Sequence, residues 1–188
     1  MTLDECRQKV EEWLSLKLTI GRCSALLADD LAQHMLGRTL NVFCIYDEIG
    51  TLEGEPWTHS QSTKPASMFT RPVLRGLWHK HYTAPAFVMR NLINHWTQAR
   101  TEALAAEIEA RIEVVPDRKC DLLAHRLVVD GYSERHEARQ MTGEWIVFAK
   151  RDAGNVYLTL ASHSEADEKI RERVDRAAAE FPDLELSI

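Results

Sequence analysis

The sequence predicts a single α+β domain spanning residues 1–188. Three observations lead to this class: helical periodicity over residues 1–37, further helical patterns through the middle of the chain, and a β-hairpin near the end that is followed by one more helix. The expected architecture is a helical N-terminal half, a small antiparallel sheet with a C-terminal hairpin, and a C-terminal helix. A chain of 188 residues fits one domain.

Two amphipathic helices are predicted at the N-terminus. Residues 3–18 place apolar side chains three and four positions apart, and Thr2 with Glu5 has the form of a capping box. A second helix is predicted over residues 22–36, and Gly37 follows where a left-handed residue would end it.

A strand and a long loop are predicted next. Residues 39–46 are rich in β-branched and aromatic side chains, which favours a strand. Residues 47–72 contain several glycines and prolines among serines and threonines, which predicts a long loop. Such loops are often functional, and a disordered insertion is the alternative.

The middle of the chain is predicted to be mostly helical. After the short dense segment 73–82, apolar residues recur at helical spacing over residues 86–112, beginning behind Pro85. Another helix is predicted over 117–129, a turn at Asp130–Gly131, and a helical or irregular segment over 133–141.

The hairpin is the strongest β signal. Its strands are predicted at residues 144–150 and 155–161, joined by Arg-Asp-Ala-Gly, and the weak alternation of the first strand indicates burial on both faces. We expect the hairpin to pack against the helix over 86–112. A final helix is predicted over 165–180. The predicted core residues of the hairpin are Trp145, Val147, Leu158 and Leu160.

Composition excludes several classes of protein. Hydrophobic residues make up 45% and charged residues 28%, which is ordinary for a soluble globular protein, and no apolar run approaches the roughly 20 residues that span a bilayer. The acidic N-terminus lacks the pattern of a signal peptide. The four cysteines are scattered, which argues against a cysteine zinc site and a disulfide scaffold. We therefore expect a cytoplasmic protein with no membrane partner and no cofactor.

Residues 56–101 contain no aspartate or glutamate and carry a charge of +6, whereas the rest of the chain has 17 basic and 29 acidic residues. The stretch also holds six large aromatic residues and four of the eight histidines. This composition suits RNA or another phosphate-bearing ligand. The alternative is that its cations pair with acidic neighbours inside the fold. The net charge of −6 argues against indiscriminate coating of DNA.

Histidines provide the candidate chemistry. His79 and His81 lie on one side of the backbone if it is extended, and His163 directly follows the last predicted strand. Imidazoles near neutrality suit general acid and base catalysis of transphosphorylation. The same three histidines suit a metal ion. A third alternative is structural, with His79 and His81 hydrogen-bonded to backbone in a packed turn.

The candidate site is larger than these histidines. Ser60, Ser62 and Thr63 stand beside Lys64, where small hydroxyls and a lysine can hold a phosphate. No P-loop, nucleophile elbow, His-Glu-x-x-His helix or dinucleotide-binding glycine pattern is present. The predicted site residues are His79, His81, His163 and Glu144 for catalysis, Lys64, Arg71, Arg75, Lys80 and Lys150 for phosphate binding, and Trp78, Tyr82 and Tyr157 for stacking.

The segment Gly143-Glu-Trp-Ile-Val-Phe-Ala-Lys150 with Asn155-Val-Tyr-Leu-Thr-Leu resembles the closing hairpin of barnase/EndoU/RelE-like bacterial ribonuclease toxins. The resemblance covers about residues 142–163 and implies metal-independent cleavage of RNA, with a cognate inhibitor protein as partner. The helix after the hairpin and the helical front half depart from that family. Lys64-Pro-Ala and residues 77–82 resemble uncharacterised bacterial proteins.

Two other functions remain open at this point. One is a binding module, without turnover, for a nucleic acid, a nucleotide or an acidic protein. The other is a metal-dependent hydrolase with histidine ligands. The sequence indicates no oligomeric state.

Overall fold

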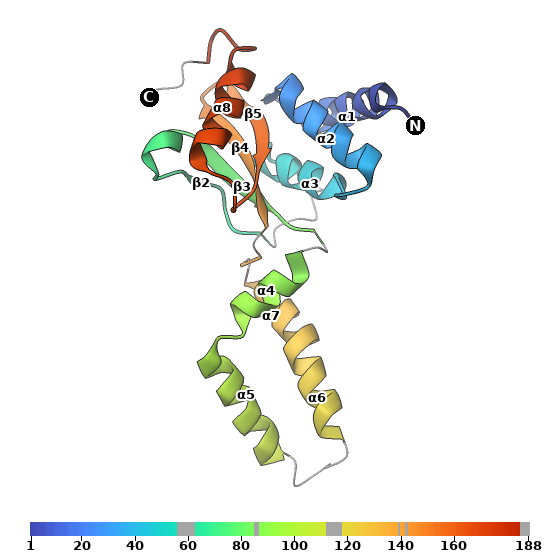
Figure 1. The fold of residues 1–188 in the computed structure, drawn as a ribbon, viewed down its shortest axis with the longest axis vertical. Helices are drawn as coiled ribbons and strands as arrows, with labels where there is room; N and C mark the ends of the chain where they lie inside the picture. The colour runs from blue at the N-terminus through green and yellow to red at the C-terminus, as the bar shows by residue number, and fades with distance from the viewer. Residues whose placement is uncertain (56–62, 85–86, 112–117, 139, 142, 185–188) are drawn as a thin grey trace.

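The chain forms a mixed five-stranded sheet with helices on both faces, and a helical extension projects away from it (Figure 1). The structure is a computed structural model that describes residues 1–55, 63–84, 87–111, 118–138, 140–141 and 143–184. This architecture confirms the α+β class. In the sheet order β1-β5-β4-β3-β2, the strands are β1 (Arg22–Cys23), β5 (Gly154–Ala161), β4 (Glu144–Arg151), β3 (Trp78–Tyr82) and β2 (Ser67–Met68).

The hairpin of β4 and β5 forms as predicted. Its turn ends at Gly154, which has φ 116°, and a Cβ there would lie 2.7 Å from the carbonyl oxygen of Ile20, so glycine is required. Residues 145–149 are all buried, which confirms that β4 is covered on both faces. The predicted core residues are buried too: Trp145 (5% exposed), Val147 (0%), Leu158 (0%) and Leu160 (7%).

Helices α1 (Leu3–Lys17), α2 (Ala25–Gly37) and α3 (Phe43–Leu52) cover one face of the sheet. Helix α1 begins with the predicted capping box, since the Thr2 hydroxyl accepts from the Glu5 N–H and the Glu5 carboxylate accepts from the Thr2 N–H. The fully buried members of this first core include Cys6, Val10, Leu27, Leu31, Ile45, Ile49, Ile146 and Tyr157.

The other face is covered by α8 (Asp167–Ala178) and the short 3-10 helix η1 (Pro72–Leu74). The second core lies beneath them, and its fully buried members include Leu74, Val147, Ala149, Leu158, Ile170, Val174 and Ala177. The predicted packing of the hairpin against a central helix is wrong. Instead, α2 and α8 contact β5 from opposite faces, because they carry the apolar stripes that match the two cores.

The helical extension is inserted between β3 and β4 (Figure 1). In the picture α5 and α6 extend away from the sheet, and they contact each other, as α4 and α7 do nearer to the sheet. No helix of the described residues is long and apolar enough to cross a membrane. Its elements are α4 (Val88–His95), α5 (Gln98–Arg111), α6 (Lys119–His125), the π-helical turn η4 (Arg126–Asp130) and α7 (Gly131–Glu137).

Two predictions in the extension, one of a helix and one of a turn, are wrong. The helix over 86–112 is interrupted between α4 and α5 at Trp96, whose indole N–H donates to the Leu127 carbonyl oxygen at 2.7 Å. The predicted turn at Asp130–Gly131 lies inside a continuous run from α6 through η4 to α7. A Cβ at Gly131 would lie 2.5 Å from the Trp96 indole nitrogen, so this glycine serves close packing and makes no turn.

The predicted strand over 39–46 is also wrong, because its second half is the start of α3. Ile45, Tyr46 and Ile49 have helical spacing and are buried in the first core, so packing overrides their β propensity. The predicted loop over 47–72 is consequently shorter: α3 occupies its beginning, and β2 and η1 lie toward its end. Residues 56–62 lie outside the described residues.

The second helix begins and ends later than predicted. Arg22 and Cys23 pair with β5 as a parallel strand, and the Ser24 side chain accepts from the Leu27 N–H to start α2. The left-handed residue after the helix is Arg38 (φ 52°), whereas Gly37 is the last helical residue.

Candidate functional site

His79 and His81 lie on the same face of β3, as the extended backbone requires. Their ring centroids are 5.6 Å apart, and both rings contact Trp145 of the neighbouring strand β4. This face of the sheet carries the second core, so the two imidazoles sit at the border of an apolar layer. His81 is 6% exposed, and His79 is half-buried.

His163 joins them from the segment that follows β5. Its ring is stacked on that of His81, with centroids 5.2 Å apart and an interplanar angle of 18°. It also lies against Trp145, at a centroid distance of 4.1 Å. The structure therefore brings the three predicted histidines into one cluster around a single tryptophan.

One carbonyl orients two of the imidazoles. The Gly143 carbonyl oxygen lies 3.0 Å from Nδ1 of His81 and 2.8 Å from Nε2 of His163. Because a carbonyl only accepts hydrogen bonds, both of these ring nitrogens carry a proton. In the neutral rings, the lone pairs are then on Nε2 of His81 and on Nδ1 of His163.

Residue 143 must be a glycine for this arrangement. A Cβ at position 143 would lie 1.7 Å from the carbonyl oxygen of Tyr82, a distance that no packing adjustment of side chains relieves. The close approach of the two backbones therefore places the shared carbonyl between the histidines. The sequence places Gly143 at the start of the hairpin but gives no sign of this role.

Burial keeps two of the histidines neutral. Burial, together with the neighbouring His81 and His163, lowers the pKa of His79 to about 4. Burial also lowers the pKa of His81 to about 4, although the hydrogen bond to Gly143 opposes the shift. Near neutral pH both side chains are therefore free bases and do not act as acids.

The cluster contains polar atoms that lack a partner in the described part of the chain. These are Nδ1 of His79 and the indole Nε1 of Trp145, a residue that is 5% exposed. Nε2 of His79 lies 3.3 Å from the Ser67 hydroxyl, and the Phe69 ring packs on the same imidazole at 4.4 Å. A buried N–H without an acceptor is costly, so an acceptor group supplied by a ligand would be favourable here.

Lys80 is a correction to the predicted phosphate-binding set. It points to the face of β3 opposite the histidines and is 4% exposed. Its ammonium lies 3.0 Å from a carboxylate oxygen of Glu48 and donates to the Lys64 carbonyl at 2.8 Å and to the Thr63 hydroxyl. Lys80 therefore holds the backbone at Lys64 and does not reach a ligand.

The other predicted phosphate-binding residues differ in their position relative to the histidine cluster. Lys64 is exposed and contributes to lowering the pKa of both His79 and His81, as Arg71 does for His79, so both cations lie near the cluster. Arg71 is paired with Asp167 at 2.7 Å. Arg75 is exposed beside η1. The ammonium of Lys150 lies 5.0 Å from the Trp78 ring, so it is on the other face of the sheet and away from the histidines.

The predicted stacking residues are corrected by their burial. Tyr82 is 5% exposed and Tyr157 is fully buried, and the Tyr157 hydroxyl donates to Glu53 at 2.7 Å. Trp78 packs against the first core, on the face opposite the histidines. Alternation along the strands turns these three rings inward, so none of them is available to a base beside the cluster.

Glu144 was predicted to be catalytic, but it lies beside the histidine cluster and holds the backbone of His163. One carboxylate oxygen accepts from the His163 backbone N–H at 2.6 Å, and the other lies 3.5 Å from Arg90. Several cations of residues 56–101 therefore pair with acidic residues elsewhere in the fold, as the alternative for this stretch expected: Arg71, Lys80 and Arg90. The predicted Ser60 and Ser62 lie outside the described residues, whereas Thr63 is buried beside Lys80.

Within the described ranges, no group of three or more histidine, cysteine, aspartate or glutamate side chains could hold a metal ion. One ring nitrogen of His81 and one of His163 are engaged by the Gly143 carbonyl.

Sequence reasoning found the three histidines and missed their surroundings. Trp145 was predicted as a core residue only, and Phe69 and Ser67 were part of the predicted loop. The pairing of β3 with β4, which places His81 opposite Trp145, is what assembles them. Comparison with known proteins finds no matching family model, no matching curated protein and no matching solved structure.

Proposed function

We propose that this protein cleaves RNA by metal-independent transphosphorylation at the cluster of His79, His81 and His163. The observation that carries the proposal is the shared Gly143 carbonyl, which orients His81 and His163 and leaves each with one ring nitrogen for a ligand. The resemblance of the closing hairpin to ribonuclease toxins supports the same class of reaction.

His81 is the proposed general base. Its pKa of about 4 keeps it unprotonated at neutral pH, and its Nε2 lone pair is directed away from the Gly143 carbonyl. It would take the proton of a ribose 2′-hydroxyl while the 2′-oxygen attacks the adjacent phosphorus. A phosphate bound nearby favours the protonated imidazole, which strengthens this base when substrate is present.

His163 is the proposed general acid. The residue is exposed, and an imidazolium at this position carries an N–H on Nδ1 in addition to the Nε2 N–H that donates to the Gly143 carbonyl. That proton would pass to the 5′-oxygen as its bond to phosphorus breaks, giving a 2′,3′-cyclic phosphate and a free 5′-hydroxyl. The stack of the two rings keeps base and acid adjacent.

Lys64 is the proposed phosphate-binding group. Lys64 is the nearby exposed cation, and Lys80 fixes its backbone carbonyl. The indole N–H of Trp145 and Nδ1 of His79 are buried and without a partner in the described residues, so they would reach a phosphate only if the side chains around them shifted. Hydrogen bonds from donors of this kind to a phosphate oxygen are charge-assisted and strong.

The test is cleavage of a short mixed-sequence RNA, labelled at its 5′ end, by purified protein in the presence of EDTA. We expect cleavage that ends in a 2′,3′-cyclic phosphate, and no cleavage of the DNA of the same sequence, which lacks the attacking hydroxyl. His163→Ala and His81→Gln should each reduce the rate at least about a hundredfold, the usual contribution of a general acid or base.

The matched control is His136→Ala, which removes an exposed histidine of α7 outside the cluster and should leave the rate unchanged. Circular dichroism of each variant separates loss of chemistry from loss of fold. An RNA that stays intact with the wild-type protein contradicts the proposal, and binding without cleavage would favour the binding-module alternative. Cleavage that EDTA abolishes would transfer the chemistry to a metal ion.

A further inference from the structure

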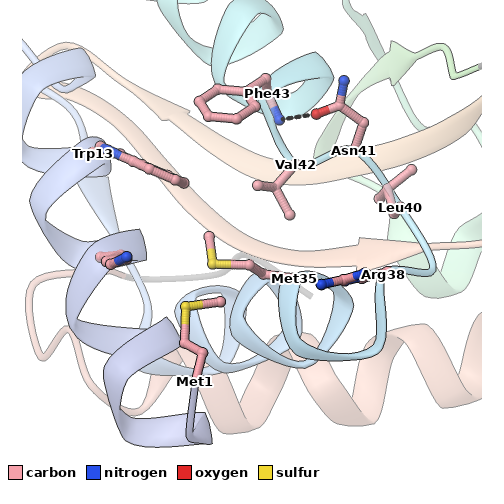
Figure 2. A pocket seen from close by; sticks show the side chains of 9 residues that line it. Met1, Trp13, Met35, Arg38, Leu40, Asn41, Val42 and Phe43 are labelled. Carbon is pink, nitrogen blue, oxygen red and sulfur yellow. Dashed lines mark hydrogen bonds between the residues drawn. The ribbon is translucent and has the colours of Figure 1, made fainter.

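A second candidate ligand site lies between α1 and the connection from α2 to α3 (Figure 2). It is a pocket of about 460 Å³, within the range that small-molecule sites occupy. It borders the first core, on the face of the sheet opposite the histidine cluster. The residues that line it are Met1, Lys9, Trp13, Met35, Arg38, Leu40, Asn41, Val42 and Phe43.

Two aromatic rings form one wall of this pocket. Trp13 of α1 and Phe43 of α3 are 4.8 Å apart between ring centroids, with an interplanar angle of 40°. Phe43 remains 53% exposed, although a side chain of this size usually gains from burial. The Asn41 side chain accepts from the Phe43 N–H at 3.2 Å and fixes the start of α3, as Figure 2 shows.

The charges of the pocket have a single sign. Lys9 and Arg38 line it, no acidic side chain does, and neither cation forms an ion pair within the described residues. This is unusual in a chain whose net charge is −6. An anion beside these two groups would be attracted to both of them.

The backbone at Arg38 is a second, independent observation. Arg38 is the one residue other than glycine with a positive φ among those that the structure describes. Glycine adopts this left-handed conformation without strain, and Gly37 stands one position earlier in the chain. The fold thus places a strained arginine at the pocket where a glycine would be easier to accommodate, and such outliers are enriched at ligand sites.

We infer that this pocket binds a small aromatic anion, a ligand with a flat ring and a carboxylate, sulfonate or phosphate group. The ring would pack on Trp13 and Phe43, with the Met35 side chain as a further apolar contact. The anionic group would accept hydrogen bonds from Arg38 and Lys9. The inference is independent of the proposed cleavage of RNA, because the two sites share no residue.

The probe is naphthalene-2-sulfonate, titrated into ¹⁵N-labelled protein while the indole N–H resonance of Trp13 is followed by NMR. That resonance is assigned with a Trp13→Phe variant. We expect it to shift saturably, and we expect 2-naphthalenemethanol, which has the same ring without the charge, to bind at least about tenfold more weakly, the size of one charge-assisted hydrogen bond.

Two variants test the cations. Arg38→Gly and Lys9→Gln should each weaken binding of the sulfonate about tenfold. Arg38→Gly relieves the strained backbone, so a loss of affinity in this variant does not come from a weakened fold. Arg176→Gln is the matched control, since it removes an exposed cation of α8 on the opposite face of the sheet.

The inference is overturned if the Trp13 resonance does not respond to the sulfonate. It is also overturned if the charged and neutral probes bind equally, or if Arg176→Gln weakens binding as much as the two pocket variants do.

Discussion

Replacing Lys80 by methionine is expected to destabilise the fold by about 3–5 kcal/mol, because it leaves the Glu48 carboxylate buried without its cation. The two charged groups are 3.0 Å apart, and the residues are 4% and 1% exposed. The loss would be a large part of the roughly 5–15 kcal/mol that stabilises a typical domain. It would also remove the hydrogen bonds from Lys80 to the Thr63 hydroxyl and to the Lys64 carbonyl.

Urea denaturation followed by tryptophan fluorescence measures this loss, and a double-mutant cycle identifies its source. Glu48→Gln alone should also be costly, because it leaves the ammonium of Lys80 buried with no carboxylate opposite. The double variant Lys80→Met/Glu48→Gln should recover about 2 kcal/mol or more of the summed single losses. A Lys80→Met protein that is nearly as stable as wild type but has lost RNA cleavage would refute this reasoning, since Lys80 would then act on the ligand as the sequence suggested.

Four further outcomes follow from the same structure. Leu160→Ala should lower the free energy of unfolding in urea by about 2–4 kcal/mol, because Leu160 is 7% exposed in the first core. A loss within about 0.5 kcal/mol would mean that the Leu160 side chain does not point into this core. Gly143→Ala should lower the melting temperature and should reduce the rate of any RNA cleavage at least about tenfold, because the added Cβ displaces the carbonyl that orients two histidines. An unchanged cleavage rate would show that this carbonyl has no part in the mechanism. Arg38→Gly should raise stability by about 1 kcal/mol by relieving a left-handed backbone, and a lower melting temperature would contradict that strain. Stability should fall as the pH is lowered from about 6.5 to 4, because burial lowers the pKa of both His79 and His81 to about 4 and the unfolded chain takes up these protons first. The share of His81 is a loss of about 2 kcal/mol after allowance for solvent screening, so His81→Gln should make the profile shallower while His79 keeps part of the slope.

Local patterns in the sequence were sufficient for several elements. The capping box of α1, the hairpin of β4 and β5 and the burial of its four core residues were predicted correctly, because hydrogen bonds and periodicity between near neighbours determine them. The position of His79 and His81 on one side of the chain followed from alternation alone, once the segment was extended.

Contacts between distant segments determined the rest. Residues 39–46 have β propensity, yet the second half of this segment forms the start of α3, because the apolar face of α3 packs in the first core. Lys80 was predicted to bind phosphate. In the fold, β3 pairs with β4 and the Lys80 side chain points into the protein, where it pairs with Glu48.

The histidine cluster shows the same division. The sequence by itself provided one histidine directly after a predicted strand and two more that share a side of the chain if their segment is extended. The tertiary structure decided that His81 and His163 share the Gly143 carbonyl, that Trp145 lies among them and that burial lowers the pKa of His79 and His81. These properties depend on distance and desolvation, and both are set by residues that lie far apart in the chain and meet only when the sheet closes.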